Sequence, residues 1–82
     1  MVELSIIIPT YNEGKYLGKL LNSIIIQNYR DYEIIVSDNN STDSTLRIAK
    51  IYKCKIVKGG RPGRARNNGA KIANWKYLLF ID

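Results

Sequence analysis

Ser5-Ile6-Ile7-Ile8-Pro9-Thr10-Tyr11-Asn12-Glu13 is the stretch that decides the fold of this chain. A short, unbroken apolar run is typical of a strand buried in a parallel sheet that has helices on both faces. We therefore expect residues 4 to 8 to form the central strand, which ends where Pro9 removes a ladder donor. Ligands of open parallel sheets bind beyond the carboxyl ends of the strands, so residues 9 to 13 mark the expected site.

The residues after Glu13 predict a helix that packs on this strand. Apolar side chains recur at the spacing of one helical face within residues 14 to 27, at Leu17, Leu20, Leu21, Ile24 and Ile25. A second apolar run, residues 32 to 37, predicts another buried strand. It ends at the polar cluster of residues 38 to 45, whose Ser, Thr and Asp side chains can cap the first turn of the next helix.

The rest of the chain continues the alternation of strands and helices. We expect a helix over residues 43 to 53, a strand over 54 to 57, a basic loop over 58 to 63 and a last strand over 77 to 81. The helix before that last strand has a small inner face that allows close approach to the sheet, formed by Ala65, Gly69, Ile72 and Ala73. Right-handed crossovers would arrange this β-α-β-α-β-α-β chain as a three-layer, Rossmann-like open parallel sheet of strand order 3-2-1-4.

Composition limits the classes of function. Eighty-two residues form one small domain, which buries roughly 60% of the surface of its unfolded chain. The net charge of +6 favours an anionic partner. Because the chain has no His and a single cysteine, Cys54, it has no internal disulfide, and any metal would be a hard cation held by oxygen. No apolar run approaches the roughly 20 residues of a membrane span, and the amino terminus lacks a signal sequence, so we expect a cytoplasmic location.

Asp38 is the first candidate site residue. A carboxylate at the carboxyl end of the second strand can accept hydrogen bonds from a base imide or a ribose, and Tyr11, one strand away, offers a flat face for stacking. The alternative is that Asp38 only forms a turn and Tyr11 is a loop aromatic, since clusters of Asp and Asn form Asx-turns without a ligand.

A basic cluster at the start of the third helix is the second candidate, formed by Lys58, Arg61, Arg64 and Arg66. Cations are disfavoured near the positive end of a helix dipole, so this placement favours a bound anion. A diphosphate would meet helix amides and guanidinium groups together. A solvated charged loop is the alternative.

Asp82 is the third candidate, an acid that ends an apolar strand. Mg²⁺ or Mn²⁺ is usually held by one or two carboxylates together with substrate phosphates, so a single acid is an incomplete metal site. Motifs for other chemistries are missing: no Gly-x-Gly-x-x-Gly follows the first strand, there is no Gly-Lys-Ser/Thr phosphate loop, and a Ser-His-Asp triad needs a His. Cys54 is more typical of a small buried residue than of a nucleophile.

Four segments in order resemble the amino-terminal part of a family 2 glycosyltransferase of the GT-A fold. They are Ile7-Ile8-Pro9-Thr10-Tyr11-Asn12-Glu13, Ile34-Ile35-Val36-Ser37-Asp38-Asn39-Asn40-Ser41-Thr42-Asp43-Ser44-Thr45, Gly63-Arg64-Ala65-Arg66-Asn67-Asn68-Gly69-Ala70 and Tyr77-Leu78-Leu79-Phe80-Ile81-Asp82. Each segment alone is a weak signal, and the four together are a strong one. The resemblance implies that residues 1 to 82 are the nucleotide-sugar-binding half of such a domain.

The resemblance also implies roles for single residues. Pro9, Tyr11 and Glu13 would lie around the nucleoside, and Asp38 would contact the base. Arg66 would lie near the base or the diphosphate, with Arg61 and Arg64 as further candidates for the diphosphate. Asp82 matches the first acid of the family's Asp-x-Asp motif. The family commonly has Asp-Asp-Gly-Ser after its second strand, whereas this chain has Asp38-Asn39-Asn40-Ser41, which keeps only the first acid.

Such an enzyme transfers a sugar from a nucleoside-diphosphate sugar to a hydroxyl of a saccharide, lipid or protein, with Mg²⁺ or Mn²⁺ as cofactor in the full-length protein. None of the acids of this chain is expected to be the catalytic base, so we expect the chain alone to be inactive or nearly so. Because Asp82 alone is an incomplete metal site, we also expect the chain alone to bind no metal. We also expect a homodimer through an exposed edge of the fourth strand, and peripheral contact with a membrane is compatible with the cytoplasmic location. The alternatives are a non-catalytic nucleotide-binding module and a basic nucleic-acid-binding domain; the second is disfavoured because the basic residues gather at one loop.

Overall fold

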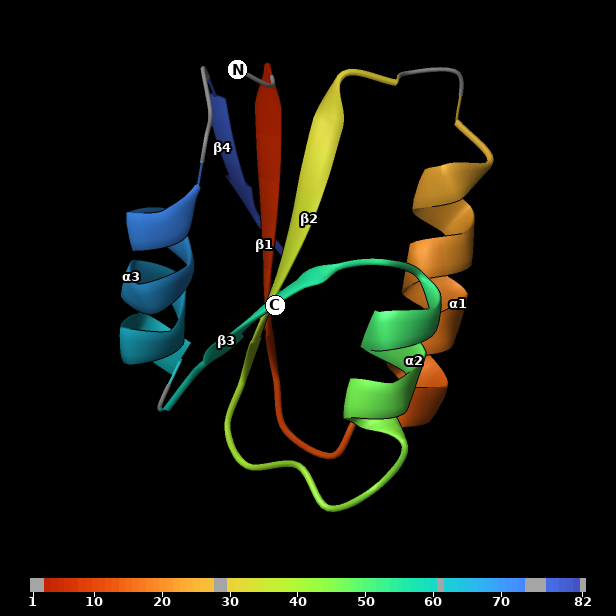
Figure 1. Cartoon of the computed structure of the whole chain (residues 1–82), viewed down its shortest axis with the longest axis vertical. Coiled ribbons are helices and arrows are strands. Elements are labelled where there is room, and N and C mark those ends of the chain that lie inside the picture. The colour runs from red at the N-terminus through yellow and green to blue at the C-terminus, as the bar shows by residue number, and fades with distance from the viewer. Residues whose placement is uncertain (1–2, 28–29, 61, 74–76, 82) are drawn as a thin grey trace.

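The computed structural model describes residues 3–27, 30–60, 62–73 and 77–81 as strands and helices in strict alternation. Figure 1 shows one sheet between helices on its two sides. The strands are β1 (Leu4–Thr10), β2 (Tyr32–Asp38), β3 (Lys55–Lys58) and β4 (Tyr77–Phe80), and the helices are α1 (Gly14–Ile25), α2 (Thr45–Ile51) and α3 (Pro62–Ile72). None of the helices in these four stretches is long and apolar enough to cross a membrane.

The four strands form one sheet in the order β3-β2-β1-β4, and every neighbouring pair is parallel. This is the order expected from the sequence. The longest ladder joins β1 to β2, from Leu4 opposite Tyr32 to Thr10 opposite Asp38. Because these two central strands end together, the loops that follow them leave the same edge of the sheet (Figure 1).

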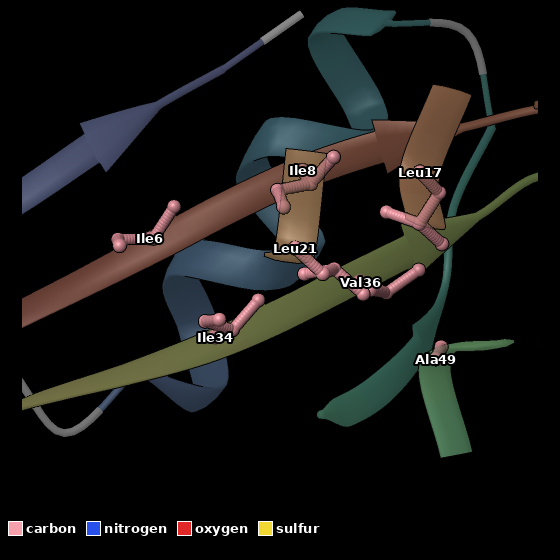
Figure 2. Packing of buried hydrophobic residues seen from close by; sticks show 7 residues of the cluster. All are labelled: Ile6, Ile8, Leu17, Leu21, Ile34, Val36 and Ala49. Carbon is pink, nitrogen blue, oxygen red and sulfur yellow. The ribbon is translucent and has the colours of Figure 1, made fainter. Parts of the chain in front are cut away.

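One face of the sheet carries the main apolar core, where α1 and α2 pack. Alternate side chains of β1 and β2 meet apolar side chains of the two helices, as Figure 2 shows for Ile6, Ile8, Leu17, Leu21, Ile34, Val36 and Ala49. All of these side chains are buried. The helical spacing found in the sequence therefore indicates the correct face of α1, since Leu17 and Leu21 are both among the most deeply buried residues.

The opposite face of the sheet is covered by α3, which approaches very closely at Gly69. A Cβ atom added to Gly69 would lie 2.5 Å from Cγ2 of Ile7, a fully buried residue of β1. The expectation that the small residues of this helix allow close packing on the sheet is confirmed at this position. On the same face, Ser5 donates a 2.5 Å hydrogen bond to Glu33, and Glu33 forms a 2.6 Å ion pair with Lys55.

Some element boundaries differ from those expected. β1 continues through Pro9 to Thr10, whereas the sequence predicts an end at Ile8. Successive residues of a strand bond to opposite neighbours, and Ile7 accepts a bond from Ile81 on the β4 side. The backbone of Pro9 faces the β4 side as well. The described ladder with β4 ends opposite Ile7, before it reaches Pro9, so the missing N–H of Pro9 removes no bond from that ladder.

The third helix also begins earlier than expected. The sequence predicts a basic loop over residues 58 to 63, but Lys58 still belongs to β3 and α3 begins at Pro62. Proline is favoured in the first turn of a helix, because its fixed φ suits the helix and its missing N–H would be unpaired there anyway. The loop between β3 and α3 is therefore shorter than the sequence indicates.

Candidate functional site

The candidate site lies at the carboxyl edge of the sheet, where three strands end side by side. Thr10 of β1 is opposite Asp38 of β2, and Asp38 is opposite Lys58 of β3. Backbone hydrogen bonds continue beyond this row: the Asn39 amide donates to the Thr10 carbonyl at 2.9 Å, and the Gly59 amide donates to the Asp38 carbonyl at 2.7 Å. The edge is thus built around Asp38, with a loop on either side of it.

The Asp38 carboxylate is held by three hydrogen-bond donors. Its Oδ1 accepts from the Thr10 hydroxyl at 2.5 Å and from the Ser41 hydroxyl at 2.6 Å, while its Oδ2 accepts from the Ser41 amide at 2.9 Å. The side chain is only 5% exposed. The hydrogen bonds to Ser41 agree with the turn-forming alternative, and the base contact stays a prediction. Asp38 shapes its own turn, and the part of the chain that the structure describes leaves acceptor capacity on Oδ2, because a carboxylate oxygen has two lone pairs.

The other residues expected around the nucleoside lie in the loop that follows β1. Tyr11 is 58% exposed, Glu13 is exposed as well, and Pro9 is partly buried at the end of the strand. Among the described residues no hydrogen bond joins Tyr11 to Asp38; the two are brought to the same edge because Tyr11 directly follows Thr10, the residue opposite Asp38 in the β1–β2 ladder. The exposed ring thus offers a flat surface at the same edge of the sheet as the buried acid.

The loop after β1 and the loop after β2 are joined by hydrogen bonds in both directions (Figure 1 shows the two loops side by side). The Asn12 amide donates to the Ser41 hydroxyl at 2.8 Å, and the Asn12 side-chain oxygen accepts from the Thr42 amide at 2.7 Å. One residue later, the Glu13 amide donates to the Thr45 hydroxyl at 3.0 Å. Asp38 and Tyr11 are therefore carried by loops that form one connected unit.

Asp43 caps α1 and α2, two of the helices that begin at this edge. Its Oδ2 accepts from the Gly14 amide at 3.0 Å, at the start of α1, and its Oδ1 accepts from the Thr45 amide at 2.9 Å, at the start of α2. The Thr45 hydroxyl also donates to Oδ1. These hydrogen bonds favour the charged carboxylate and lower the pKa of Asp43 below its ordinary value, and the bond from the Thr45 hydroxyl makes the largest contribution. The expected capping of the second helix is thus due to Asp43, while Ser44 forms no side-chain cap.

Two of the basic residues expected near a diphosphate can be placed: Lys58 is the last residue of β3, and Arg64 lies in the first turn of α3. No acidic residue stands in its first turn. Arg64 is exposed and its aliphatic stem lies against Gly60, and Asn68 donates a 2.8 Å hydrogen bond to the Lys58 carbonyl, which ties α3 to the end of β3. Arg66 belongs to α3 but its side chain is not among those described, and Arg61 lies outside the described residues.

The described residues contain no cluster of metal-ligating side chains. No three His, Cys, Asp or Glu side chains converge anywhere in residues 3–27, 30–60, 62–73 and 77–81. Asp82, the acid expected to contribute to metal binding, lies outside the described residues. The two acids of these loops, Asp38 and Asp43, accept hydrogen bonds from the backbone amides of Ser41 and Gly14, respectively.

Several residues that shape this edge cannot be assigned a site role from the sequence alone, namely Thr10, Asn12, Ser41, Asp43 and Thr45. The signal available for Thr10 is its alternation with Ile6 and Ile8, which places it on the same face of β1. For the others the signal is only a high density of Ser, Thr, Asp and Asn. Such residues bond to nearby backbone in many ways, so composition alone does not say that they join two separate loops.

Comparison with known proteins assigns a family to this arrangement. The family model for glycosyl transferase family 2 matches residues 5–82. The poly(ribitol-phosphate) beta-N-acetylglucosaminyltransferase TarS of Staphylococcus aureus is 38% identical over an alignment that covers 100% of this chain and 16% of the relative. The chain thus spans about a sixth of that relative's length.

Solved structures agree in fold. A crystal structure of S. aureus TarS residues 1–349 in complex with UDP superimposes with a TM-score of 0.89 at 37% identity, covering 98% of this chain and 27% of that one. Glucosyl-3-phosphoglycerate synthase from Mycobacterium tuberculosis, in complex with Mn²⁺, UDP and glucosyl-3-phosphoglycerate, gives a TM-score of 0.78 at 25% identity, covering 99% and 33%. The described sheet and helices match the Rossmann-like GT-A fold of these neighbours. The chain therefore belongs to glycosyl transferase family 2.

Proposed function

We propose that this chain supplies the donor-binding part of an enzyme that transfers a sugar from a nucleoside-diphosphate sugar to an acceptor hydroxyl. The observation that carries the proposal is Asp38, a buried carboxylate fixed by three donors at the end of β2, with the exposed ring of Tyr11 at the end of the neighbouring strand. A carboxylate can accept a hydrogen bond from the edge of a nucleoside base, and an aromatic ring can stack on the face of that base. Pro9 and Glu13 flank this pair in the same loop.

Uracil is the base that we propose for this site. A carboxylate is an acceptor only, so Asp38 favours a base that presents an N–H donor on its pairing edge, as uracil and thymine do at N3 and guanine does at N1, over cytosine, which presents an acceptor at N3. The described contacts leave Oδ2 with one donor, the Ser41 amide, and therefore with room for one more. UDP is the nucleotide bound in the TarS structure to which this chain is similar.

The diphosphate would lie at the start of α3. This helix has no acid in its first turn and has the exposed Arg64 there, so an anion bound at this end could meet both the first-turn amides, which have no partner within the helix, and a guanidinium group. Arg61 and Arg66 are the further candidates. Gly59 bonds directly to Asp38, which ties the loop before this helix to the proposed base site.

The remaining parts of the reaction are assigned to residues outside those described. Asp82 is proposed as the first acid of an Asp-x-Asp motif that would hold Mg²⁺ or Mn²⁺ together with the donor, as a divalent ion accompanies UDP in the mycobacterial synthase. The catalytic base and the acceptor site belong to the part of such enzymes that this chain does not cover, since it spans 16% of TarS. We therefore expect the 82-residue chain to bind nucleotide without turning over nucleotide sugars.

We further propose that the chain self-associates through β4. Within the described sheet, β4 pairs with β1 alone, so its other edge offers unpaired backbone groups. The opposite edge strand, β3, carries Lys55 and Lys58, charges that discourage pairing. Light scattering over a range of concentrations should give a dimer mass, and a monomer mass throughout would contradict this proposal. The cytoplasmic location and contact with a membrane surface stay predictions.

Isothermal titration calorimetry with UDP tests the donor-binding proposal. Asp38→Ala should weaken UDP binding by about tenfold or more, since a hydrogen bond to a charged group contributes roughly 1.5 kcal/mol or more. The matched control is Asp31→Ala, which removes the same charge from an exposed position at the opposite end of β2 and should leave the affinity unchanged. Equal affinities for all three proteins would contradict the assignment. Salt-dependent binding to random oligonucleotides without binding to UDP would favour the nucleic-acid alternative instead.

A further inference from the structure

Two sets of hydrogen bonds join the loop after β1 to the loop after β2. The first set centres on Asn12, whose φ of 48° lies in the left-handed region that Asn tolerates. Its side-chain oxygen accepts from the Thr42 amide at 2.7 Å and from the Asp43 amide at 3.3 Å. Its own amide donates to the Ser41 hydroxyl, and that hydroxyl donates to Asp38. One side chain in the Tyr11 loop thus organises the loop that holds Asp38.

The second set of bonds runs through Thr45 and Asp43. The Thr45 hydroxyl accepts from the Glu13 amide at 3.0 Å and donates to Asp43, whose other oxygen accepts from the Gly14 amide. Thr45 is fully buried, so its hydroxyl is fixed by packing as well as by these bonds. The approach at Gly14 is close, since a Cβ atom there would overlap the Ser44 hydroxyl oxygen and would force it to move.

We propose that Asn12, Asp43 and Thr45 are positioning residues for the nucleotide: they lock the two loops together so that Tyr11 and Asp38 already have their bound arrangement before the ligand arrives. The effect on nucleotide binding rests on the proposed function, and the geometry rests on the hydrogen bonds between the two loops. None of the three residues has to touch the nucleotide. If only a fraction of molecules has the locked arrangement, the apparent dissociation constant rises by the inverse of that fraction.

Thr45 offers the sharpest pair of variants. Thr45→Val keeps the shape of this buried side chain and removes the hydroxyl that joins Glu13 to Asp43, whereas Thr45→Ser keeps the hydroxyl. We expect Thr45→Val to weaken UDP binding by about tenfold, the effect of losing roughly 1.4 kcal/mol of preorganisation, and Thr45→Ser to bind UDP within about twofold of the natural protein. Asn12→Gly is an independent variant, because Gly also accepts a positive φ but lacks the oxygen that holds Thr42.

Amide hydrogen exchange without ligand tests the lock by itself. In the natural protein the Glu13, Gly14 and Thr42 amides should exchange slowly. Thr45→Val should speed exchange at Glu13 and Gly14, and Asn12→Gly should speed it at Thr42, while amides of the central strands, such as that of Val36, keep their protection. Faster exchange throughout the sheet would mean general destabilisation and would overturn the proposal, as would slow exchange at all three loop amides in the variants.

The two readouts separate the lock from the proposed function. If the natural protein fails to bind UDP, the proposed function is wrong, and the exchange pattern still decides whether the lock exists. If UDP binds and exchange rises at the loop amides but affinity does not fall in Thr45→Val or Asn12→Gly, the lock has no part in positioning and the proposal is overturned. Faster loop exchange with weaker binding, restored by Thr45→Ser, supports it.

Discussion

The Thr10 hydroxyl donates a 2.5 Å hydrogen bond to Oδ1 of Asp38, across the two central strands of the sheet. The two residues are opposite each other in the β1–β2 ladder, and both are 5% exposed. A hydrogen bond to a buried charged group is among the stronger ones in a protein, and leaving such a group without its donor is costly. The position of the acid proposed to read the base is therefore set by the neighbouring strand as well as by its own loop.

Thr10→Val should weaken UDP binding and lower stability together. The substitution preserves the shape of the side chain but removes one of the three donors to Asp38, which we expect to cost about 1.5–3 kcal/mol in the free energy of unfolding and about tenfold in affinity. Urea denaturation and calorimetry measure the two quantities. Thr10→Ser retains the hydroxyl and should recover most of the affinity; if Thr10→Val binds UDP as tightly as the natural protein, Asp38 does not depend on this bond.

Asp43 should titrate below its ordinary pKa of 3.8. Since its folded pKa is lowered, its contribution to stability is complete above the ordinary value and is lost as the pH falls through the lowered one. NMR titration of the carboxyl carbon measures this pKa. Thr45→Val should raise it, because the hydrogen bond from the Thr45 hydroxyl is the largest cause of the shift. The same value in Thr45→Val and in the natural protein would show that this hydroxyl does not stabilise the charge.

Gly69→Ala should destabilise the fold by about 1–3 kcal/mol, because the added methyl group would press on the side chain of Ile7 and force α3 away from the sheet. Gly18→Ala in α1 is the matched control. Its Cβ atom would lie 4.0 Å from Cγ2 of Ile48, an ordinary van der Waals contact, so the better helix propensity of Ala should stabilise the protein by up to about 1 kcal/mol. Chemical denaturation that gave both variants the same sign would contradict the close packing at Gly69.

Cys54 should react slowly with alkylating agents at neutral pH. Burial raises the pKa of this half-buried thiol to about 11, so the reactive thiolate is scarce at any pH well below that value. Mass spectrometry after treatment with iodoacetamide should show slow modification in the folded protein and rapid modification in urea. Equal rates in both conditions would indicate that the thiol is not shielded by the fold.

The sequence predicts the fold well because periodic apolar residues are a direct consequence of burial. Ile6, Ile8, Leu17 and Leu21 lie in the core that their spacing indicates. The end of β1 was less predictable, since whether Pro9 breaks a ladder depends on which side of the strand its neighbour occupies. The starts of the helices also depend on contacts between residues far apart in the sequence. Asp43, for example, accepts hydrogen bonds from the Gly14 and Thr45 amides, and α2 begins at Thr45.

The candidate site was predictable in part. The position of Asp38 at the end of an apolar strand is enough to place it at the carboxyl edge, and the structure has it there. The bonds from Thr10 and Ser41 that fix its carboxylate depend on the register of β1 with β2 and on the left-handed turn at Asn40, which the order of residues does not specify. The roles of Arg66 and Asp82 stay predictions, because the structure does not describe their side chains.

A crystal structure of the chain with UDP tests the central claim most directly. The account predicts the uracil ring against Tyr11, with its N3 atom about 2.7–3.2 Å from a carboxylate oxygen of Asp38, and the diphosphate near the start of α3. Uracil bound at another part of the surface, with Asp38 contacting only Thr10 and Ser41, would contradict it.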